Sequence, residues 1–257
     1  MGRALELVAA LTTAPGATMT TATVLTGVSN VVRDSRKPIK MVAQWDRRQA
    51  AGITRITSAL LHDSTVGIQH GCPAAGITTR VLAPAQALYP QDTLNIAMTG
   101  SAVAGDIEHM CILIEYDDLP GVSGRFITPA ELSRRARNQF SNTIVISSGT
   151  SGQFTGSAAV NSAQDQFKAN TDYALVGYVI DANAAVAIRY VGPDWGNLGL
   201  GGPGYAQGQL WDTATWFLDL GTIPVMNSSN KALTLIDCVQ DENGADPSVT
   251  TMWVELS

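Results

Sequence analysis

The 257-residue sequence predicts an all-β protein of two tandem jelly-roll β-sandwich barrels, with an N-terminal arm and a short linking helix. Three observations predict this class. The composition is rich in Thr, Ser, Ala and Val and holds 24 glycines, which favours strands and turns over helix bundles. Segments that alternate apolar and polar residues recur along the chain, with one clear helix signal between them. Finally, the order of the predicted strands in the first half recurs in the second.

The first 48 residues are interpreted as the arm. A helix is predicted over Ala4–Leu11, and Glu6 interrupts its apolar run, so a signal peptide is not expected. A Thr-rich stretch and the basic segment VVRDSRKPIK (31–40) follow, and Pro15 and Pro38 argue against a compact domain.

Residues 49–124 are the first predicted jelly roll. ITRITSALLHDSTVGIQHG (53–71) predicts two strands around a turn at His62–Ser64, and LNIAMTG and IEHMCILIEY predict two more. Five or six strands are recognisable in this half, which is fewer than the eight of a closed jelly roll.

Residues 125–140 are the predicted linking helix. In TPAELSRRARNQF (128–140), Thr128 is placed as the N-cap, Pro129 takes the first helical position, and Glu131 completes a capping box. Its arginines are interpreted as a solvated helix face.

Residues 141–257 are the second predicted jelly roll. NTIVISSG predicts one strand, and YALVGYVIDANAAVAIRYVGP (173–193) predicts a hairpin. The glycine-rich DWGNLGLGGPGYAQGQ (194–209) is interpreted as a long loop, and TATWFLDLG, KALTLIDCV and VTTMWVEL as the remaining strands.

The repeat is the strongest signal in the chain. VAIRYVGP at 186–193 resembles VGIQHGCP at 66–73, with an offset of 120 residues. In both halves a hairpin, a loop and a closing pair of strands follow in the same order. Because this period suits one β-sandwich and is too long for a solenoid repeat or a propeller blade, we interpret it as an internal duplication.

Charge is sparse and unevenly placed. Charged residues make up 15% of the chain, below the roughly 25% of typical soluble domains, so we expect partners to cover much of the surface. Two Lys/Arg stand against seven Asp/Glu in residues 49–124, and three against eleven in 141–257, whereas the arm and the linking helix are basic. This asymmetry predicts that different parts face different partners.

A tandem pair of β-sandwiches in a short, cysteine-poor, sparsely charged chain with an N-terminal arm resembles the double jelly-roll major capsid proteins. These belong to icosahedral, often membrane-containing, viruses of bacteria and archaea. The resemblance implies a structural virion protein and not an enzyme, whose homotrimer forms a pseudo-hexameric capsomer. The implied partners are neighbouring capsomers, vertex or minor capsid proteins, and, through the arm, an internal lipid membrane or the packaged genome.

Two sets of contact residues follow from this interpretation. Trp195, Asn197 and Tyr205 in the glycine-rich loop are the candidate intersubunit contacts. The candidate inner-face contacts to anionic lipid or nucleic acid are Arg33, Arg36, Lys37 and Lys40. A solvated or ion-paired surface is the alternative for these basic residues. The alternative function is a carbohydrate- or receptor-binding β-sandwich of a viral spike or surface adhesin, with Trp195 and Tyr205 as its only aromatic sign.

The sequence predicts neither a catalytic centre nor a bound cofactor. GLGGPG matches G-x-G-x-x-G, but no helix follows it to hold a phosphate, and no G-x-S-x-G motif occurs. The H-x-C pairs His70/Cys72 and His109/Cys111 each put two side chains on one strand face, and together the four could form a zinc site. Small buried cysteines with satisfied histidines are the interpretation we favour. The acidic turns lack the ligand spacing of an EF-hand, although a calcium ion between subunits stays an open alternative.

Overall fold

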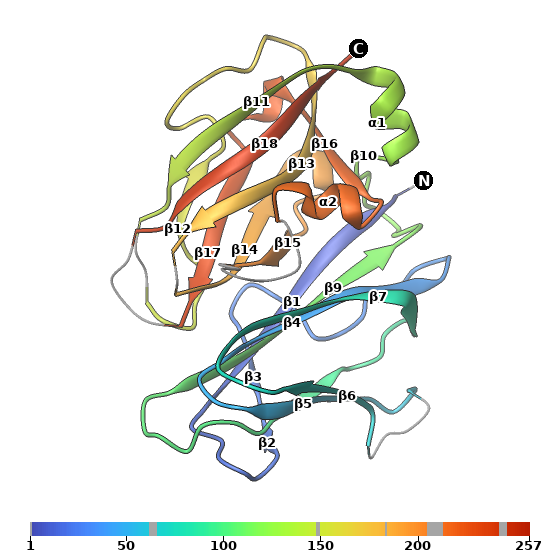
Figure 1. Ribbon diagram of the computed structural model, residues 1–257. Helices are drawn as coiled ribbons and strands as arrows, with labels where there is room; N and C mark the ends of the chain where they lie inside the picture. Colours follow the sequence, from blue (N-terminus) through green and yellow to red (C-terminus); the bar gives the residue numbers. More distant parts are fainter. Residues whose placement is uncertain (1, 62–65, 148–149, 183, 205–212, 242–245) are drawn as a thin grey trace.

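In the computed structural model the chain folds into two β-sandwiches, which Figure 1 shows one above the other. The structure describes residues 2–61, 66–147, 150–182, 184–204, 213–241 and 246–257. The first sandwich spans residues 4–116 and the second spans residues 136–256. The all-β class predicted from the sequence is therefore confirmed. Among the described residues, no helix has the length and apolar character needed to cross a membrane.

The first sandwich has two antiparallel sheets with the strand orders β3-β1-β9-β4-β7 and β2-β8-β5-β6. If β3 is set aside and the other eight strands are numbered in chain order, the sheets read 1-8-3-6 and 2-7-4-5, which is the order of a jelly roll. The strands are β1 (Ala4–Thr13), β2 (Thr20–Thr21), β3 (Thr23–Val24), β4 (Ile39–Arg48), β5 (Gly52–Thr57), β6 (Ile68–Cys72), β7 (Gly76–Leu88), β8 (Asn95–Met98) and β9 (Ile107–Tyr116).

The second sandwich repeats this order. Its sheets are β10-β16-β13-β18-β11 and β12-β17-β14-β15, so the eight strands from β11 onward again read 1-8-3-6 and 2-7-4-5. The strands are β10 (Phe126–Ile127), β11 (Ala136–Val145), β12 (Thr155–Ala159), β13 (Asp172–Asp181), β14 (Ala185–Val191), β15 (Leu200–Pro203), β16 (Ile223–Asn227), β17 (Leu235–Gln240) and β18 (Ser248–Leu256). The helices are α1 (Pro129–Arg135), α2 (Trp216–Asp219) and three single 3-10 turns, Pro193–Trp195, Thr213–Thr215 and Ser228–Asn230.

The two sandwiches share one strand topology, which supports the duplication. However, the sequence match between VAIRYVGP and VGIQHGCP pairs a strand of the second sandwich with the strand that follows its true equivalent in the first. β5 and β6 pair within one sheet, whereas β13 and β14 lie in different sheets and form no hairpin. The equivalent of β14 is therefore β5, and not the β6 segment that resembles VAIRYVGP. In the corrected alignment Arg55 of β5 matches Arg189 of β14, since Ile56 and Tyr190 then both point into their sandwiches.

The predicted N-terminal arm of residues 1–48 is wrong, and so is the helix at Ala4–Leu11. β1 lies inside a sheet between β3 and β9, and β4 lies between β9 and β7. β1 and β9 are buried on both faces, so neither shows the alternating pattern of a half-buried strand. The first jelly roll therefore begins at Ala4 and not at residue 49, and its missing strands came from the supposed arm.

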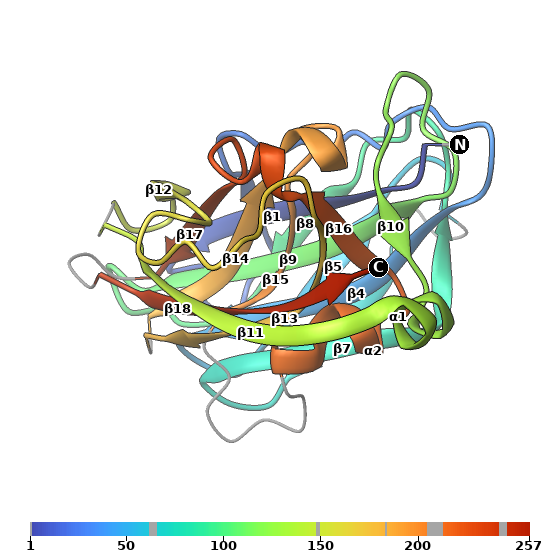
Figure 2. The ribbon, with the colours of Figure 1, turned by 90° about the horizontal axis from the view of Figure 1, so that it is seen from above.

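The linking helix is shorter than predicted. α1 covers Pro129–Arg135 only, with the expected capping box between Thr128 and Glu131. Ala136 then adopts extended backbone and starts β11, so the second sandwich begins before residue 141. Figure 2 shows α1 at the end of β11, on the outside of the molecule. The glycine-rich segment is not wholly loop, because it contains β15, and the strand expected at TATWFLDLG is instead a 3-10 turn followed by α2.

Candidate functional site

The two sandwiches meet in a large buried joint. The outer face of β1, β9 and β4 packs on the outer face of β14, β15 and β17, and both sides belong to one buried apolar cluster. The N–H of Leu7 donates to the carbonyl of Gly199 at 2.7 Å, which ties the two sheets by their backbones. A Cβ on Gly201 would overlap the carbonyl oxygen of Ile188 and lie 3.1 Å from a methyl of Leu7, so the glycine is required mainly by the neighbouring strand and also leaves room for the leucine.

Trp45 lies at the centre of this joint. Its side chain is fully buried, and its indole N–H donates to the carbonyl of Val186 across the joint at 3.1 Å. Its ring meets that of Trp216 edge to face, with 6.0 Å between centroids. Edge-to-face packing of two large rings contributes stability beyond the apolar area that it buries. The two sandwiches therefore share a core and are not separate domains on a linker.

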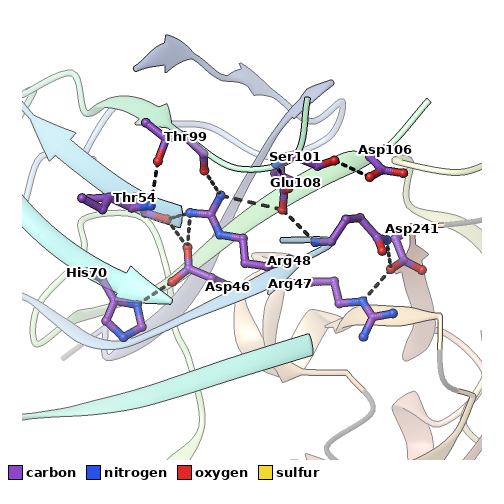
Figure 3. Close-up of polar contacts among 12 residues, drawn as sticks. Asp46, Arg47, Arg48, Thr54, His70, Thr99, Ser101, Asp106, Glu108 and Asp241 are labelled. Atoms are coloured by element: carbon purple, nitrogen blue, oxygen red, sulfur yellow. Dashed lines mark hydrogen bonds and ion pairs between the residues drawn. The ribbon is translucent and has the colours of Figure 1, made fainter. Parts of the chain in front are cut away.

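Charged side chains close the edges of the joint. Arg47 Nε lies 2.5 Å from Asp241 Oδ2, and Gln49 Nε2 donates to the same oxygen at 2.9 Å (Figure 3). Elsewhere along the joint, Arg189 is held by Asp237 at 2.6 Å and donates from Nη1 to the carbonyl of Gly27 at 2.8 Å. Arg189 thus reaches from the second sandwich to the first.

The joint is made by two unlike faces. The first sandwich contributes the sheet that carries its first and last strands, and the second contributes its other sheet. Each sandwich consequently keeps one outer face that the other sandwich of the chain does not cover. On the second sandwich this is the outer face of β11, β18 and β13, on part of which the turn Thr213–Thr215 packs against Gly177, and on the first it is the outer face of β2, β8, β5 and β6.

Inside the first sandwich lies a buried charged network, drawn in Figure 3. Arg48 is fully buried, donates to the carbonyl of Thr99 at 2.9 Å, and lies 3.5 Å from Asp46 Oδ1 and 3.9 Å from Glu108 Oε2. Glu108 accepts backbone N–H bonds from Ser101 at 2.7 Å and Gln49 at 3.0 Å. One cation thus stands between two buried carboxylates, and removing it would leave Glu108 without an opposite charge among the described residues and Asp46 with His70 alone.

His70 and Cys72 meet at this network. His70 Nδ1 lies 2.5 Å from Asp46 Oδ2, and one ligand atom from each of Asp46, His70 and Cys72 lies within 4.8 Å of the others. Hydrogen bonding to Asp46, and secondarily to Cys72, raises the pKa of His70 to about 9. These three residues offer the oxygen, nitrogen and sulfur ligands that zinc takes in proteins.

The second H-x-C pair does not join them. β9 belongs to the other sheet, and Cys111 faces the joint, within the same apolar cluster as Trp45. His109 is fully buried beside Arg47 in the sheet register, and neither ring nitrogen has a hydrogen-bond partner among the described residues. Burial, and then the charges of Arg47 and Arg48, lower the pKa of His109 to about 3. The zinc site of four ligands considered from the sequence is therefore wrong, because His109 and Cys111 lie away from His70 and Cys72.

The predicted intersubunit loop occupies a different place. Trp195 is buried inside the second sandwich, where it packs on Tyr190 and donates to the carbonyl of Val225 at 3.1 Å. It is therefore no surface contact, because its ring completes the core. Asn197 is exposed and lines a small cleft with Glu6 and Gly27 of the first sandwich, at the joint within the chain. Tyr205 lies outside the described residues.

The four basic residues lie at the turn before β4 and at its start. Arg33 pairs with Glu6 at 2.7 Å, which raises the pKa of the guanidinium, and Lys40 lies 3.3 Å from Asp117. Arg36 and Lys37 are exposed. Neighbouring carboxylates thus offset part of the positive charge, and contact of these residues with lipid or nucleic acid stays a prediction.

Sequence reasoning missed the buried charges and the importance of Arg55. Asp46 and Arg48 stand in WDRR, which reads as the end of a basic segment, and their burial depends on strands that pair from far along the chain. Arg55 could have been found by aligning β5 with β14, because ITRIT and AIRYV share the arginine at the same place in an apolar alternation.

Comparison with known proteins adds little. No protein-family model matches the chain, and no curated protein matches it in sequence. Among solved structures, one titled as the PBSX exported protein XepA aligns over 98% of this chain and 86% of its own, with 10% identity and a TM-score of 0.30. The major capsid protein P2 from Bacteriophage PM2 aligns over 99% of this chain and 98% of its own, with 7% identity and a TM-score of 0.24. With TM-scores this low, neither likeness supports a conclusion about this chain.

Proposed function

We propose that this chain is a structural shell protein, the major capsid protein of an icosahedral virus of bacteria or archaea. Three copies form a capsomer in which six sandwiches stand in a ring, and capsomers assemble into the virion shell. The observation that carries the proposal is the joint within the chain, where two sandwiches of the same strand order meet through unlike faces.

Contacts between unlike faces can repeat. A head-to-tail contact closes into a ring when the rotation per unit divides a full turn, and otherwise continues as a filament. Each chain already contains one such contact. It also keeps one face of each kind that its other sandwich does not cover, and these two are called the free faces. If the free face of the second sandwich takes the free face of the next chain's first sandwich, three chains close a ring of six similar units.

The free face of the second sandwich suits a contact between folded subunits. It presents Thr143, Val145, Val179, Thr250 and Met252, of which Val145 is 58% exposed and Val179 is 43% exposed. Thr143 and Thr250 share a hydrogen bond of 2.8 Å across it. Interfaces that form after folding are about as apolar as the rest of a protein surface, which fits this mixture of polar and apolar groups, whereas the covered face of the first sandwich carries Leu7, Trp45 and Leu113.

The free face of the first sandwich carries Arg55, for whose side chain the described part of the chain shows no hydrogen bond or ion pair. Arg55 is the counterpart of Arg189, and its buried Nε has no hydrogen-bond partner among the described residues. Arg189 crosses the joint to a carbonyl of the other sandwich. In the proposed capsomer Arg55 makes the same kind of contact to the second sandwich of the next chain, and Ile53, which is 41% exposed on the same face, is covered.

Electron microscopy of the purified protein tests the proposal. Class averages should show rings of six lobes with three-fold symmetry, and larger shells where capsomers assemble. Two-lobed particles alone, at every concentration tried, would overturn it. The alternative of a carbohydrate- or receptor-binding module gains no support, since Trp195, one of its two aromatic signs, is part of the core.

A further inference from the structure

We propose that Asp46, His70 and Cys72 form a binding site for one zinc-class divalent cation inside the first sandwich. The three side chains come from both sheets: Asp46 from β4, and His70 and Cys72 from β6. Their ligand atoms lie within 4.8 Å of one another, and both Asp46 and Cys72 are buried.

The donor set selects the class of metal. A thiolate, an imidazole nitrogen and a carboxylate oxygen are the three ligand types that zinc takes, whereas calcium and magnesium take oxygen ligands. A tetrahedral zinc ion with ligand bonds near 2.0–2.2 Å needs its nitrogen and oxygen ligands about 3.3 Å apart. His70 Nδ1 and Asp46 Oδ2 are 2.5 Å apart, so the pair must open by less than about 1 Å, which a change of side-chain torsion supplies.

The surroundings of the site already have the form of an outer ligand shell. The two carboxylate oxygens of Asp46 have different partners. Oδ1 accepts a hydrogen bond from the Thr54 hydroxyl and lies near Arg48, while Oδ2 faces His70 (Figure 3). Hydrogen bonds to the second oxygen of a ligating carboxylate fix its direction and tune the metal. Asp46 could therefore bind a cation through Oδ2 without losing its partners on Oδ1.

A fourth protein group points at the same place. Gln44 is 1% exposed, its Nε2 lies 3.4 Å from Asp46 Oδ2, and its Oε1 has no hydrogen-bond partner among the described residues. A buried amide oxygen without a partner is costly. Rotating the amide by half a turn exchanges its oxygen and nitrogen, which are assigned only from hydrogen-bond partners. The oxygen then lies on the side of Asp46 Oδ2, the proposed ligand atom, where it could supply the fourth ligand in place of a water molecule.

The bound ion would clamp the two sheets of the first sandwich together at β6, an edge strand of its sheet. This inference is independent of the proposed capsid function. The chain supplies its own matched control, because His109 and Cys111 repeat the H-x-C spacing on a strand outside the cluster.

Metal content and cobalt spectroscopy test the site. The full-length protein is stripped with a chelator, reloaded with Zn²⁺ or Co²⁺, and desalted, and metal is counted per chain by mass spectrometry. We expect one equivalent in the unaltered protein and in Cys111→Ser, and less than a tenth of an equivalent in Cys72→Ser and His70→Gln. The Co²⁺ protein should show a thiolate charge-transfer band that Cys72→Ser removes.

Three results would overturn the site: no retained metal in the unaltered protein, equal retention in Cys72→Ser, or loss in Cys111→Ser with retention in Cys72→Ser. Circular dichroism of each variant is recorded first. If Cys72→Ser fails to fold, the charge-transfer band of the unaltered Co²⁺ protein decides alone, and its absence refutes a thiolate ligand. Electron microscopy of the stripped protein separates this outcome from the capsid proposal, which does not require the metal.

Discussion

Trp45→Ala tests whether the two sandwiches share one core. The side chain is fully buried at the joint, and replacing a buried aromatic residue by alanine costs about 3–5 kcal/mol, including the cavity that it leaves. This range already contains the lost edge-to-face contact with Trp216. No penalty for an unpaired carbonyl is added, because Val186 O also accepts from the N–H of Gly204 at 2.9 Å. We therefore expect the free energy of unfolding to fall by about 3–5 kcal/mol.

The assay is guanidinium unfolding at one fixed protein concentration, followed by two probes. Far-ultraviolet circular dichroism reports both sandwiches. Tryptophan fluorescence of the variant reports the second alone, since the four remaining tryptophans, Trp195, Trp211, Trp216 and Trp253, all follow residue 190. Both midpoints should move together to lower denaturant. Leu233→Ala, which truncates a side chain that is 64% exposed, is the control and should change stability by less than about 0.5 kcal/mol. A fluorescence midpoint unchanged from that of the unaltered protein would refute the shared core.

Three further predictions concern single residues. The pKa of His109 is about 3 when folded and near 6.5 when unfolded, so protons bind the unfolded state preferentially between these values and stability falls as pH drops from about 6.5. Arg47, held by Asp241, lies beside this ring, and the charge of Arg48 acts on it from inside the sandwich. His109→Leu should show a smaller loss of urea midpoint between pH 7 and pH 4.5, and an equal loss would contradict the assignment. Arg48→Met leaves Glu108 buried without a cation and Asp46 with His70 alone, and should cost about 3–5 kcal/mol in urea unfolding, while exposed Arg36→Met should cost less than about 0.5. Thr128→Ala removes the cap of α1, worth about 1 kcal/mol, and should speed amide exchange at Glu131 but not in β9; unchanged exchange would show that the cap does not hold the helix.

The sequence predicted the elements whose pattern is local. Alternation marked β5, β8 and β18, and the capping residues marked α1. The sequence of β1 predicts a helix because both faces of this strand are covered, one by its own sandwich and the other by the second. A strand that is buried on both faces does not alternate between apolar and polar residues. The strand conformation of β1 is therefore evident only from its pairing with β9 in the structure.

The candidate site was harder to predict because it depends on contacts between distant strands. The H-x-C spacing draws attention to His70 and Cys72, but the residue that the structure places beside them, Asp46, comes from a segment interpreted as an arm. The position of Trp195 in a glycine-rich segment predicts a surface contact. The 3-10 turn at Pro193–Trp195 instead directs the ring into the core.

The mass of the protein in solution tests the central claim most directly. Light scattering of the purified 27.1 kDa chain should give a trimer of three times that mass. Arg55→Glu, on the free face of the first sandwich, should shift the species to the monomer with unchanged circular dichroism. Arg80→Glu, exposed on β7 of the same sandwich, should leave the trimer in place. A monomeric unaltered protein at high concentration, or a trimer unaffected by Arg55→Glu, would contradict the account.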